Sequence, residues 1–332
     1  MRTHATGILL LVVAACGRTP ADVPHVTVTI PPGATLDAAI DTLASHQIVR
    51  HETLFRAYAR VRGLGADLKT GEYLLSPAAS WSEIVTTLAR GRGIEMRWTV
   101  REGLMLREIA DLASRELHIP RDSLLAAASD TGLKRELGLP PQAVDVEGYL
   151  FPTTYVIQTH TTGREMVRVM VHEFLAQWDS RWDARLDSLH LTRHQLVTLA
   201  SIVEGEVRYD PDRQFVAAVY HNRLKRGMKL EADPTILYAY GRRLKRVWEK
   251  NLAVQSPYNT YLHAGLPPGP IAQPGRASLL AALYPASVPF LYFVAQPDGK
   301  HIFSMSFAEH EAAIQRVKGM RPAARERRPS GP

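Results

Sequence analysis

The chain of 332 residues has a single cysteine, Cys16, and this scarcity excludes several kinds of site. One thiol cannot form an internal disulfide, and it cannot supply the cysteine ligands of a structural zinc site. The histidines do not make up for this lack. His172 and Glu173 begin a zincin-like pattern, but Ala176 stands where the second histidine should be. We therefore predict that the protein has no metal site.

Signatures of nucleotide binding and of serine hydrolases are missing as well. The chain has neither a glycine-rich Walker loop nor a Gly-x-Ser-x-Gly elbow. The run at residues 265–270 is rich in glycine, but three of its six residues are prolines, which have no N–H to offer a phosphate. These absences predict a protein that works without a cofactor.

The positive charge of the chain is not concentrated in a stripe. The net charge is +7, and its densest run is the extreme C-terminus, where we predict a basic disordered tail over residues 321–332. A basic protein suits an anionic partner such as a membrane surface or an acidic wall polymer. Nucleic acid is not expected as a partner, because no basic stripe is present.

No apolar run reaches the roughly 20 residues that a membrane-spanning helix needs. Arg2 and His4 precede a short apolar core at residues 8–13, and small residues then lead to Cys16. This order is typical of an export signal, and Val13-Ala-Ala-Cys16 resembles a bacterial lipobox. We predict that residues 1–15 are removed and that lipidated Cys16 anchors the exported protein on the periplasmic or outer side of a membrane. An ordinary signal peptide with an incidental cysteine is the alternative.

The rest of the chain reads as small strand–turn–helix units and longer helices, which predicts an α+β fold. Residues 26–30 alternate like a strand, and Thr35 can cap the helix that follows. A similar unit begins at Trp98 and turns at residues 102–103. Further helices are predicted at residues 165–178, 192–206 and 214–224, and a hairpin is predicted at residues 291–303. We expect an N-terminal region over residues 16–160 and a second domain over residues 161–320.

The helix at residues 192–206 carries the most informative carboxylate. Thr192 and Gln195 have the spacing of a capping box, and most of the following residues are apolar. Glu204 shares a helix face with Val197 and Ala200. A carboxyl in an apolar wall loses solvation, so its pKa should rise and it can serve as a general acid. A helix-end glutamate that faces solvent is the alternative.

Polar and aromatic residues gather in the loops that follow this helix. Aromatic faces pack on sugar rings, while amides and hydroxyls hold sugar substituents. Each residue alone also has a structural explanation, such as a cap or a turn. The residues concerned are Tyr220, Asn222, Asp233, Tyr258, Asn259 and Tyr261. We expect Glu204 to line a groove beside them.

In order along the chain, several motifs resemble the YceG-like, MltG-type family of endolytic murein transglycosylases. The motifs are Glu147-Gly-Tyr-Leu-Phe-Pro152, Leu199-Ala-Ser-Ile-Val-Glu-Gly-Glu206, Tyr220-His-Asn-Arg-Leu224, Asp233-Pro-Thr235, Ser256-Pro-Tyr-Asn-Thr-Tyr261, Gly265-Leu-Pro-Pro-Gly-Pro-Ile271, Tyr292-Phe-Val-Ala295 and His301-Ile-Phe-Ser304. The resemblance extends from about residue 26 to residue 319. It implies a LysM-like module near residues 97–150 and a mixed α/β catalytic domain at residues 161–320.

The resemblance also implies an activity. The family cleaves the β-1,4 bond between N-acetylmuramic acid and N-acetylglucosamine without water, leaving 1,6-anhydro ends, which would trim or terminate nascent glycan strands. It implies Glu204 as the catalytic residue, peptidoglycan glycan strands as the substrate, and peptidoglycan synthases as candidate partners. Residues expected to contact substrate are Glu147, Ser201, Glu206, Tyr220, Asn222, Asp233, Ser256, Tyr258, Asn259 and Tyr261.

Two other functions are kept open by the sequence. A hydrolytic muramidase would use Glu206 or Asp233 as a second carboxylate. A non-catalytic wall-binding lipoprotein would use the LysM-like module alone. The chain also departs from the family pattern in having Gly205 in place of a lysine, Gln273 in place of an asparagine, and a lipobox-like signal in place of a membrane-spanning helix. Gly205 is expected to loosen the end of the catalytic helix.

Overall fold

The computed structural model describes residues 25–31, 33–91, 93–159, 161–241 and 247–320. The predicted signal, Cys16 and the basic tail lie outside these residues. The chain forms two compact units, one of residues 1–95 with 158–160 and one of residues 96–157 with 161–332. Each unit has its own hydrophobic core. The sequence placed a boundary near residue 160, whereas the compact units divide near residue 95.

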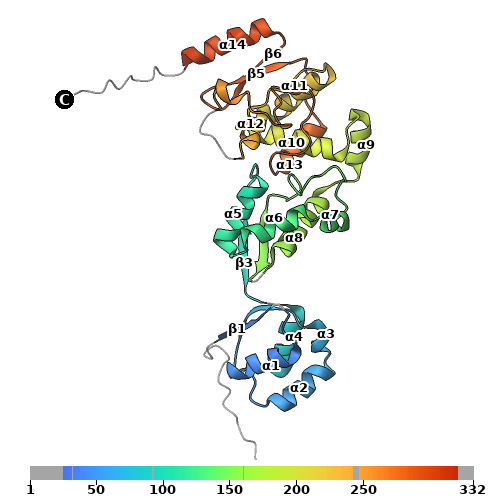
Figure 1. Ribbon diagram of the computed structural model, residues 1–332, viewed down its shortest axis with the longest axis vertical. Helices are drawn as coiled ribbons and strands as arrows, with labels where there is room; N and C mark the ends of the chain where they lie inside the picture. The colour runs from blue at the N-terminus through green and yellow to red at the C-terminus, as the bar shows by residue number, and fades with distance from the viewer. Residues whose placement is uncertain (1–24, 32, 92, 160, 242–246, 321–332) are drawn as a thin grey trace, which may run out of the picture. The chain divides into compact units, whose positions relative to one another are not determined.

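The first unit is a two-stranded sheet covered by helices (Figure 1). Its strands β1 and β2 are antiparallel, and Val28 of β1 lies opposite Tyr73 of β2. Thr35 accepts a hydrogen bond from the N–H of Ala38, so the predicted helix cap is confirmed. The elements are β1 (Val26–Ile30), α1 (Leu36–Ser45), α2 (Glu52–Val61), α3 (Leu64–Asp67), β2 (Gly71–Leu75) and α4 (Trp81–Arg90).

The second unit begins with a strand pair that encloses three helices in the sequence. Strand β3 pairs with β4, and the hydroxyls of Thr99 and Thr154 lie 2.8 Å apart across the pair. Indole Nε1 of Trp98 donates to Glu116 of α5, which ties the strand to the helix beside it. The elements are β3 (Glu95–Thr99), α5 (Leu106–Leu117), α6 (Arg121–Ser129), α7 (Thr131–Glu136) and β4 (Thr154–Gln158).

The rest of the second unit is mainly helical and closes with a hairpin. Its elements are α8 (Gly163–Gln177), α9 (Arg181–Leu189), α10 (Arg193–Glu206), η2 (Asp210–Asp212), α11 (Arg213–Lys225), α12 (Asp233–Ala239), η3 (Glu249–Asn251), α13 (Arg276–Leu283), β5 (Tyr292–Ala295), β6 (His301–Ser304) and α14 (Phe307–Met320). The predicted hairpin is confirmed as β5 and β6, which are antiparallel. Asp233 was expected in a loop, but α12 starts at this residue, with Pro234 in its first turn.

Helix α10 lies at the centre of the second unit, packed against α9, α11, α12 and α13. The hydroxyl of Thr192 accepts from the N–H of Gln195, and the Gln195 side chain accepts from the N–H of Thr192, so the predicted capping box is confirmed. Every residue from His194 to Val203 except Gln195 is buried. A helix buried on all sides holds the residues at its C-terminal end in fixed positions.

Gly205 does not end α10 early, because the helix continues to Glu206. A Cβ atom at Gly205 would lie only 2.7 Å from Cβ of Pro234. The glycine therefore lets the first turn of α12 approach the last turn of α10 closely. Gly205, where the family commonly has lysine, thus allows close packing of the two helices. The expected loosening of the end of α10 is not seen.

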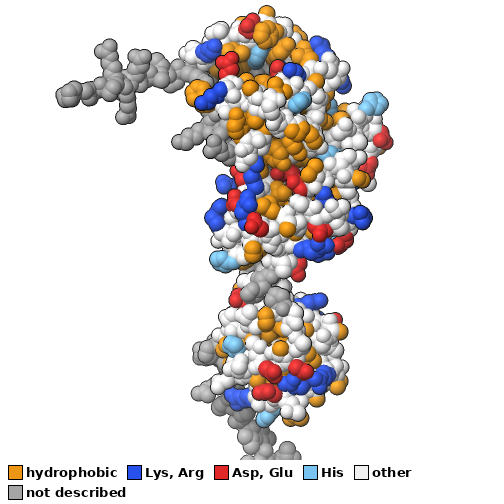
Figure 2. All heavy atoms as spheres, viewed as in Figure 1, with side chains coloured by type: hydrophobic (Ala, Val, Ile, Leu, Met, Phe, Trp, Pro, Cys, Tyr) orange, Lys and Arg blue, Asp and Glu red, His pale blue; other side chains and the backbone are white. Residues whose placement is uncertain are grey.

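Charged side chains of both signs alternate over the face of the molecule shown in Figure 2. This distribution agrees with the scattered charge expected from the sequence. Among the described residues, no helix combines the length and the apolar composition needed to cross a membrane.

Candidate active site

Glu204 lies in the last turn of α10, and its side chain is only 9% exposed. Its Oε2 accepts a hydrogen bond from the backbone N–H of Gly275, at 3.0 Å, and one from Nη1 of Arg213, at 3.3 Å. Gly275 is the N-cap of α13, so the carboxylate faces the positive end of that helix. Arg213 also donates to the buried hydroxyl of Ser278 in α13. Glu204 is thus held by α11 and α13 together.

The surroundings of Glu204 differ from those predicted. The sequence placed this carboxyl in an apolar wall, but its two hydrogen-bond donors are a guanidinium and a backbone N–H. The helical spacing brings Glu204 to the core, and the neighbouring elements supply polar groups there. Within the described residues, the hydrogen bonds and the ion pair of Glu204 are made with Arg213 and Gly275, and not with Asn222, Asp233 or the loop at residues 256–261.

A carboxyl that the sequence reading did not single out lies beside Glu204. Glu102 comes from the turn before α5, and its pKa is raised by burial of the carboxyl and by the negative charge of Glu204. The adjacent Gly103 is so near that a Cβ there would lie 3.7 Å from Cγ of Glu204. A bare Glu-Gly turn gives no sequence signal for this proximity, because residues 102 and 204 meet only in the tertiary structure.

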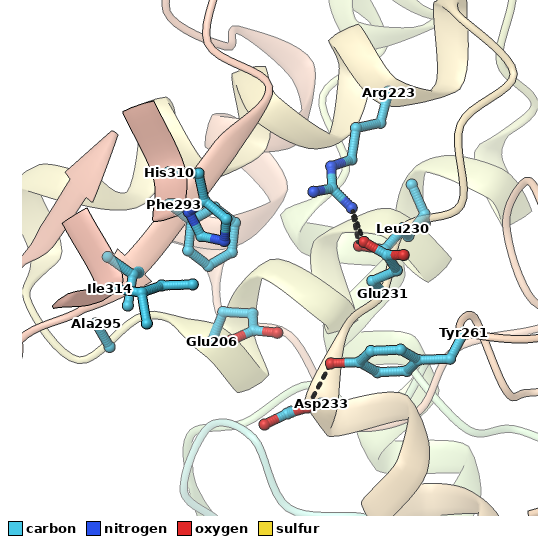
Figure 3. A pocket seen from close by; sticks show the side chains of 11 residues that line it. Glu206, Arg223, Leu230, Glu231, Asp233, Tyr261, Phe293, Ala295, His310 and Ile314 are labelled. Carbon is cyan, nitrogen blue, oxygen red and sulfur yellow. Dashed lines mark hydrogen bonds and ion pairs between the residues drawn. The ribbon is translucent and has the colours of Figure 1, made fainter. Parts of the chain in front are cut away.

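Glu206, two residues further on, belongs to a separate pocket (Figure 3). The pocket has a volume of about 380 Å³, and Glu204 is not among its lining residues. Oε1 of Glu206 accepts from the hydroxyl of Tyr220 at 3.0 Å. On the other side, the hydroxyl of Tyr261 donates to Asp233 at 2.7 Å. Three of the predicted substrate residues, Glu206, Asp233 and Tyr261, therefore line this pocket, and the buried Tyr220 binds Glu206.

The Glu206 carboxyl is the most perturbed acid of this pocket. Burial raises its pKa to about 8, and the nearby charge of Asp233 acts in the same direction. Glu206 therefore has the raised pKa that is typical of a buried carboxyl. Arg223 and Glu231, which form an ion pair 2.9 Å long, line the same pocket, as does His310 of α14.

Several residues that were predicted to contact substrate make hydrogen bonds that hold loops of the protein in place. Asn259 is fully buried, and its Nδ2 donates to the carbonyls of residues 252 and 254. Nδ2 of Asn222 donates to the carbonyls of residues 288 and 290. Ser256 accepts from the N–H of Tyr258, whose ring lies 4.7 Å from that of Tyr238. These contacts are internal to the protein, and Asn222 lies within α11 and holds a loop instead of capping a helix.

Ser201 and Glu147 are also buried inside the fold. The Ser201 hydroxyl donates to the carbonyl of Thr198 and accepts from the N–H of Ile271, so both of its hydrogen-bonding functions are used. The Glu147 carboxylate accepts from the N–H of Leu106 and from the side chain of Gln273. Burial raises the pKa of Glu147 well above its usual value. In this structure neither side chain is open to a ligand, which departs from the prediction.

Gln273 links the segment before α13 to the segments that contain Leu104 and Leu150. Besides Glu147, it binds the N–H of Leu150 through Oε1, and its own backbone pairs with Gly103 and Leu104. The segment that carries Gly275 is thereby fixed against the turn that carries Glu102. Gln273, where the family commonly has asparagine, is thus a buried residue whose hydrogen bonds hold these segments together.

Within the described ranges, no group of three or more His, Cys, Asp or Glu side chains has the geometry of a metal site.

Comparison with known proteins shows the lineage of the chain. Residues 28–316 match the model of the YceG-like family. The chain belongs to the YceG-like family. An endolytic murein transglycosylase from Bacillus subtilis is 32% identical over 308 residues, which cover 88% of this chain and 84% of the relative. A Streptococcus pneumoniae protein of the same name is 30% identical and covers 87% of this chain, which spans 58% of that protein's length.

A solved structure agrees with this membership. The crystal structure of a putative YceG-like protein from Listeria monocytogenes aligns with a TM-score of 0.61 at 31% sequence identity. The alignment covers 88% of this chain and 99% of the Listeria chain. The mixed α+β architecture predicted from the sequence is therefore confirmed, as is the family resemblance read from its motifs.

Proposed function

We propose that this protein is an endolytic lytic transglycosylase of peptidoglycan, with Glu204 as its acid and base. The enzyme cleaves the β-1,4 bond between N-acetylmuramic acid and N-acetylglucosamine inside a glycan strand. The names of the curated relatives and the family membership support the activity. The assignment of Glu204 rests on the family motif and on the geometry of its carboxyl.

The reaction needs two proton transfers through one carboxyl group. Protonated Glu204 gives its proton to the leaving glycosidic oxygen as the bond to C1 breaks. The carboxylate then accepts the proton of the C6 hydroxyl on the same muramic residue, and that oxygen bonds to C1 to close the 1,6-anhydro ring. Because the attacking hydroxyl belongs to the substrate, proximity replaces the second carboxylate that a hydrolase uses to activate water.

One observation carries the assignment. Both hydrogen bonds that Glu204 receives end on Oε2, and no described residue donates to Oε1. The side chain is thus fixed through one oxygen while the other is available to exchange a proton with a sugar. Arg213 and the N-terminus of α13 also stabilise the carboxylate that forms after proton donation. A glutamate held in this way keeps its position through both proton transfers.

The pocket lined by Glu206, Asp233 and Tyr261 supports a role in holding the glycan. Its acids and the Tyr261 phenol offer donors and acceptors to sugar hydroxyl and acetamido groups, and Phe293 adds an aromatic surface. Glu206 is not required as a second catalytic carboxylate in this scheme. A muramidase would need it, or Asp233, to act on the same bond as Glu204.

Two further parts of the proposal rest on the sequence pattern. The module near residues 97–150 is proposed to be LysM-like and to hold the glycan chain; the order strand, helices, strand from β3 to β4 supports it. The lipobox at Cys16 supports export and a lipid anchor that would keep the enzyme close to the wall and to peptidoglycan synthases.

The test is digestion of purified sacculi and of uncrosslinked glycan strands, followed by mass spectrometry of the products. The wild type should release internal fragments with 1,6-anhydro ends, and Glu204→Gln should lower the rate by at least about a hundredfold with an unchanged thermal unfolding midpoint. Products one water heavier would indicate a muramidase instead. Full activity of folded Glu204→Gln would refute the role of this residue, and strand binding with no new ends would indicate a wall-binding protein.

A further inference from the structure

Gly275 brings the carboxyl of Glu102 next to that of Glu204. A Cβ atom at Gly275 would lie 1.9 Å from Oε1 of Glu102, so the Glu102 carboxyl occupies the space that any other residue at position 275 would fill. The N–H of the same glycine donates to Glu204. One backbone unit is therefore in contact with both carboxyl groups, which places them as immediate neighbours.

The turn that carries Glu102 is fixed from outside. The N–H of Gly103 donates to the carbonyl of Gln273 at 2.8 Å, and the N–H of Gln273 donates to the carbonyl of Leu104 at 2.9 Å. Gly103 has a φ of +72°, which a residue with a side chain adopts only with strain. These backbone bonds hold the start of the LysM-like region against the segment before α13, so the proximity of the two acids is built into the fold.

The charges around Glu102 come from three elements of the second unit. Glu204 of α10 and Asp210 of η2 are negative, while Arg213 of α11 is positive. Arg213 binds Glu204 and Asp210 directly, at 3.3 Å and 2.9 Å. Two carboxylates this close repel each other, and a single guanidinium that is shared with Asp210 offsets only part of the repulsion. The state in which both Glu102 and Glu204 are ionised is therefore disfavoured.

We propose that Glu102 and Glu204 form a carboxyl pair that holds the catalytic proton jointly, with Glu102 as the positioning residue. The inference rests on the proposed function and deepens it. Arg213 and the N–H of Gly275 hold Oε2 of Glu204 in place beside the Glu102 carboxyl. Because repulsion between the two carboxylates disfavours the doubly ionised state, one proton stays on the pair.

The pair also accounts for the two directions of proton flow. When the glycosidic bond breaks, the proton leaves Glu204 for the leaving oxygen, and both carboxyls are then ionised for a moment. Their repulsion favours recapture of a proton, which the C6 hydroxyl supplies as its oxygen bonds to C1. The proton count of the pair is the same before and after the reaction, and no water or other reactant enters.

The experiment compares the pH dependence of kcat for wild type and Glu102→Gln on uncrosslinked glycan strands. The glutamine keeps the shape of the side chain and removes its charge. We expect kcat to fall about tenfold or more with KM within about twofold, and the alkaline limb of the kcat profile to move about one unit to lower pH. Glu102→Asp, which restores a carboxyl, should move the limb back toward its wild-type position.

Asp122→Asn is the matched control, because it removes one negative charge from the same module at a side chain that is 96% exposed. Gly275→Ala is a second perturbation: its Cβ must displace the Glu102 carboxyl, so the limb should shift in the same direction. Asp122→Asn should leave the alkaline limb of the kcat profile at its wild-type pH. If Glu102→Gln and Gly275→Ala also leave it there, the carboxyl pair is refuted. The proposed function would still stand if Glu204→Gln were inactive, whereas an active Glu204→Gln would refute the assignment of Glu204 itself.

Discussion

Ionisation of Glu206 should make the stability of this protein depend on pH in a predictable direction. Burial raises the pKa of Glu206 from 4.5 to about 8 in the folded protein. Between these two values the folded state binds a proton that the unfolded chain has released. The free energy of unfolding therefore falls as the pH rises through this window, and the contribution of Glu206 is fully present only below about pH 4.5.

The size of the effect follows from the shift. At about 1.36 kcal/mol for each pH unit, the full change across the window has an upper limit of roughly 4 to 5 kcal/mol. Glu206→Gln removes the ionisation but retains an oxygen that can accept from Tyr220. The variant should lack this part of the decline, and near pH 8 it should be more stable than the wild type.

The measurement is urea unfolding of both proteins at several pH values from 4.5 to 8.5. Subtracting the variant's free energy of unfolding from that of the wild type removes the contributions of all other titrating groups. We expect this difference to become more negative by at least about 1 kcal/mol between pH 5 and pH 8. A difference that stays constant within about 0.3 kcal/mol would show that Glu206 is ionised in the folded protein and would refute the account of its pocket.

Two further substitutions test the packing around the site. Gly205→Ala places a Cβ 2.7 Å from the ring of Pro234 and should lower the free energy of unfolding by about 1 to 3 kcal/mol, measured by urea unfolding; an unchanged stability would mean that α12 can move away freely. Asn259→Ala leaves the carbonyls of residues 252 and 254 without their donor and should cost about 1 to 3 kcal/mol. Limited proteolysis should then cut the loop at residues 252–261 faster than in the wild type. Equal cleavage rates would show that Asn259 does not hold this loop in place.

Much of the local structure follows from short-range signals in the sequence. The capping box at Thr192 and the apolar run behind it predict α10 and its burial, because both depend only on residues within a few turns. The alternation at residues 26–30 and the turn at residues 298–299 predict β1 and the β5–β6 hairpin for the same reason. Helices α13 and α14 were not predicted.

The sequence alone determined the family, the candidate catalytic residue Glu204 and the general α+β class, since each is encoded in contiguous motifs. It did not determine what surrounds that residue. Arg213, Gly275 and Glu102 reach Glu204 from three separate segments, and only long-range packing decides that they do. The same packing separates Glu204 from Glu206, two residues away, and gives the raised pKa to Glu206. Solvation and neighbouring charge are properties of the assembled fold, so a helical pattern can place a carboxyl but cannot state its chemistry.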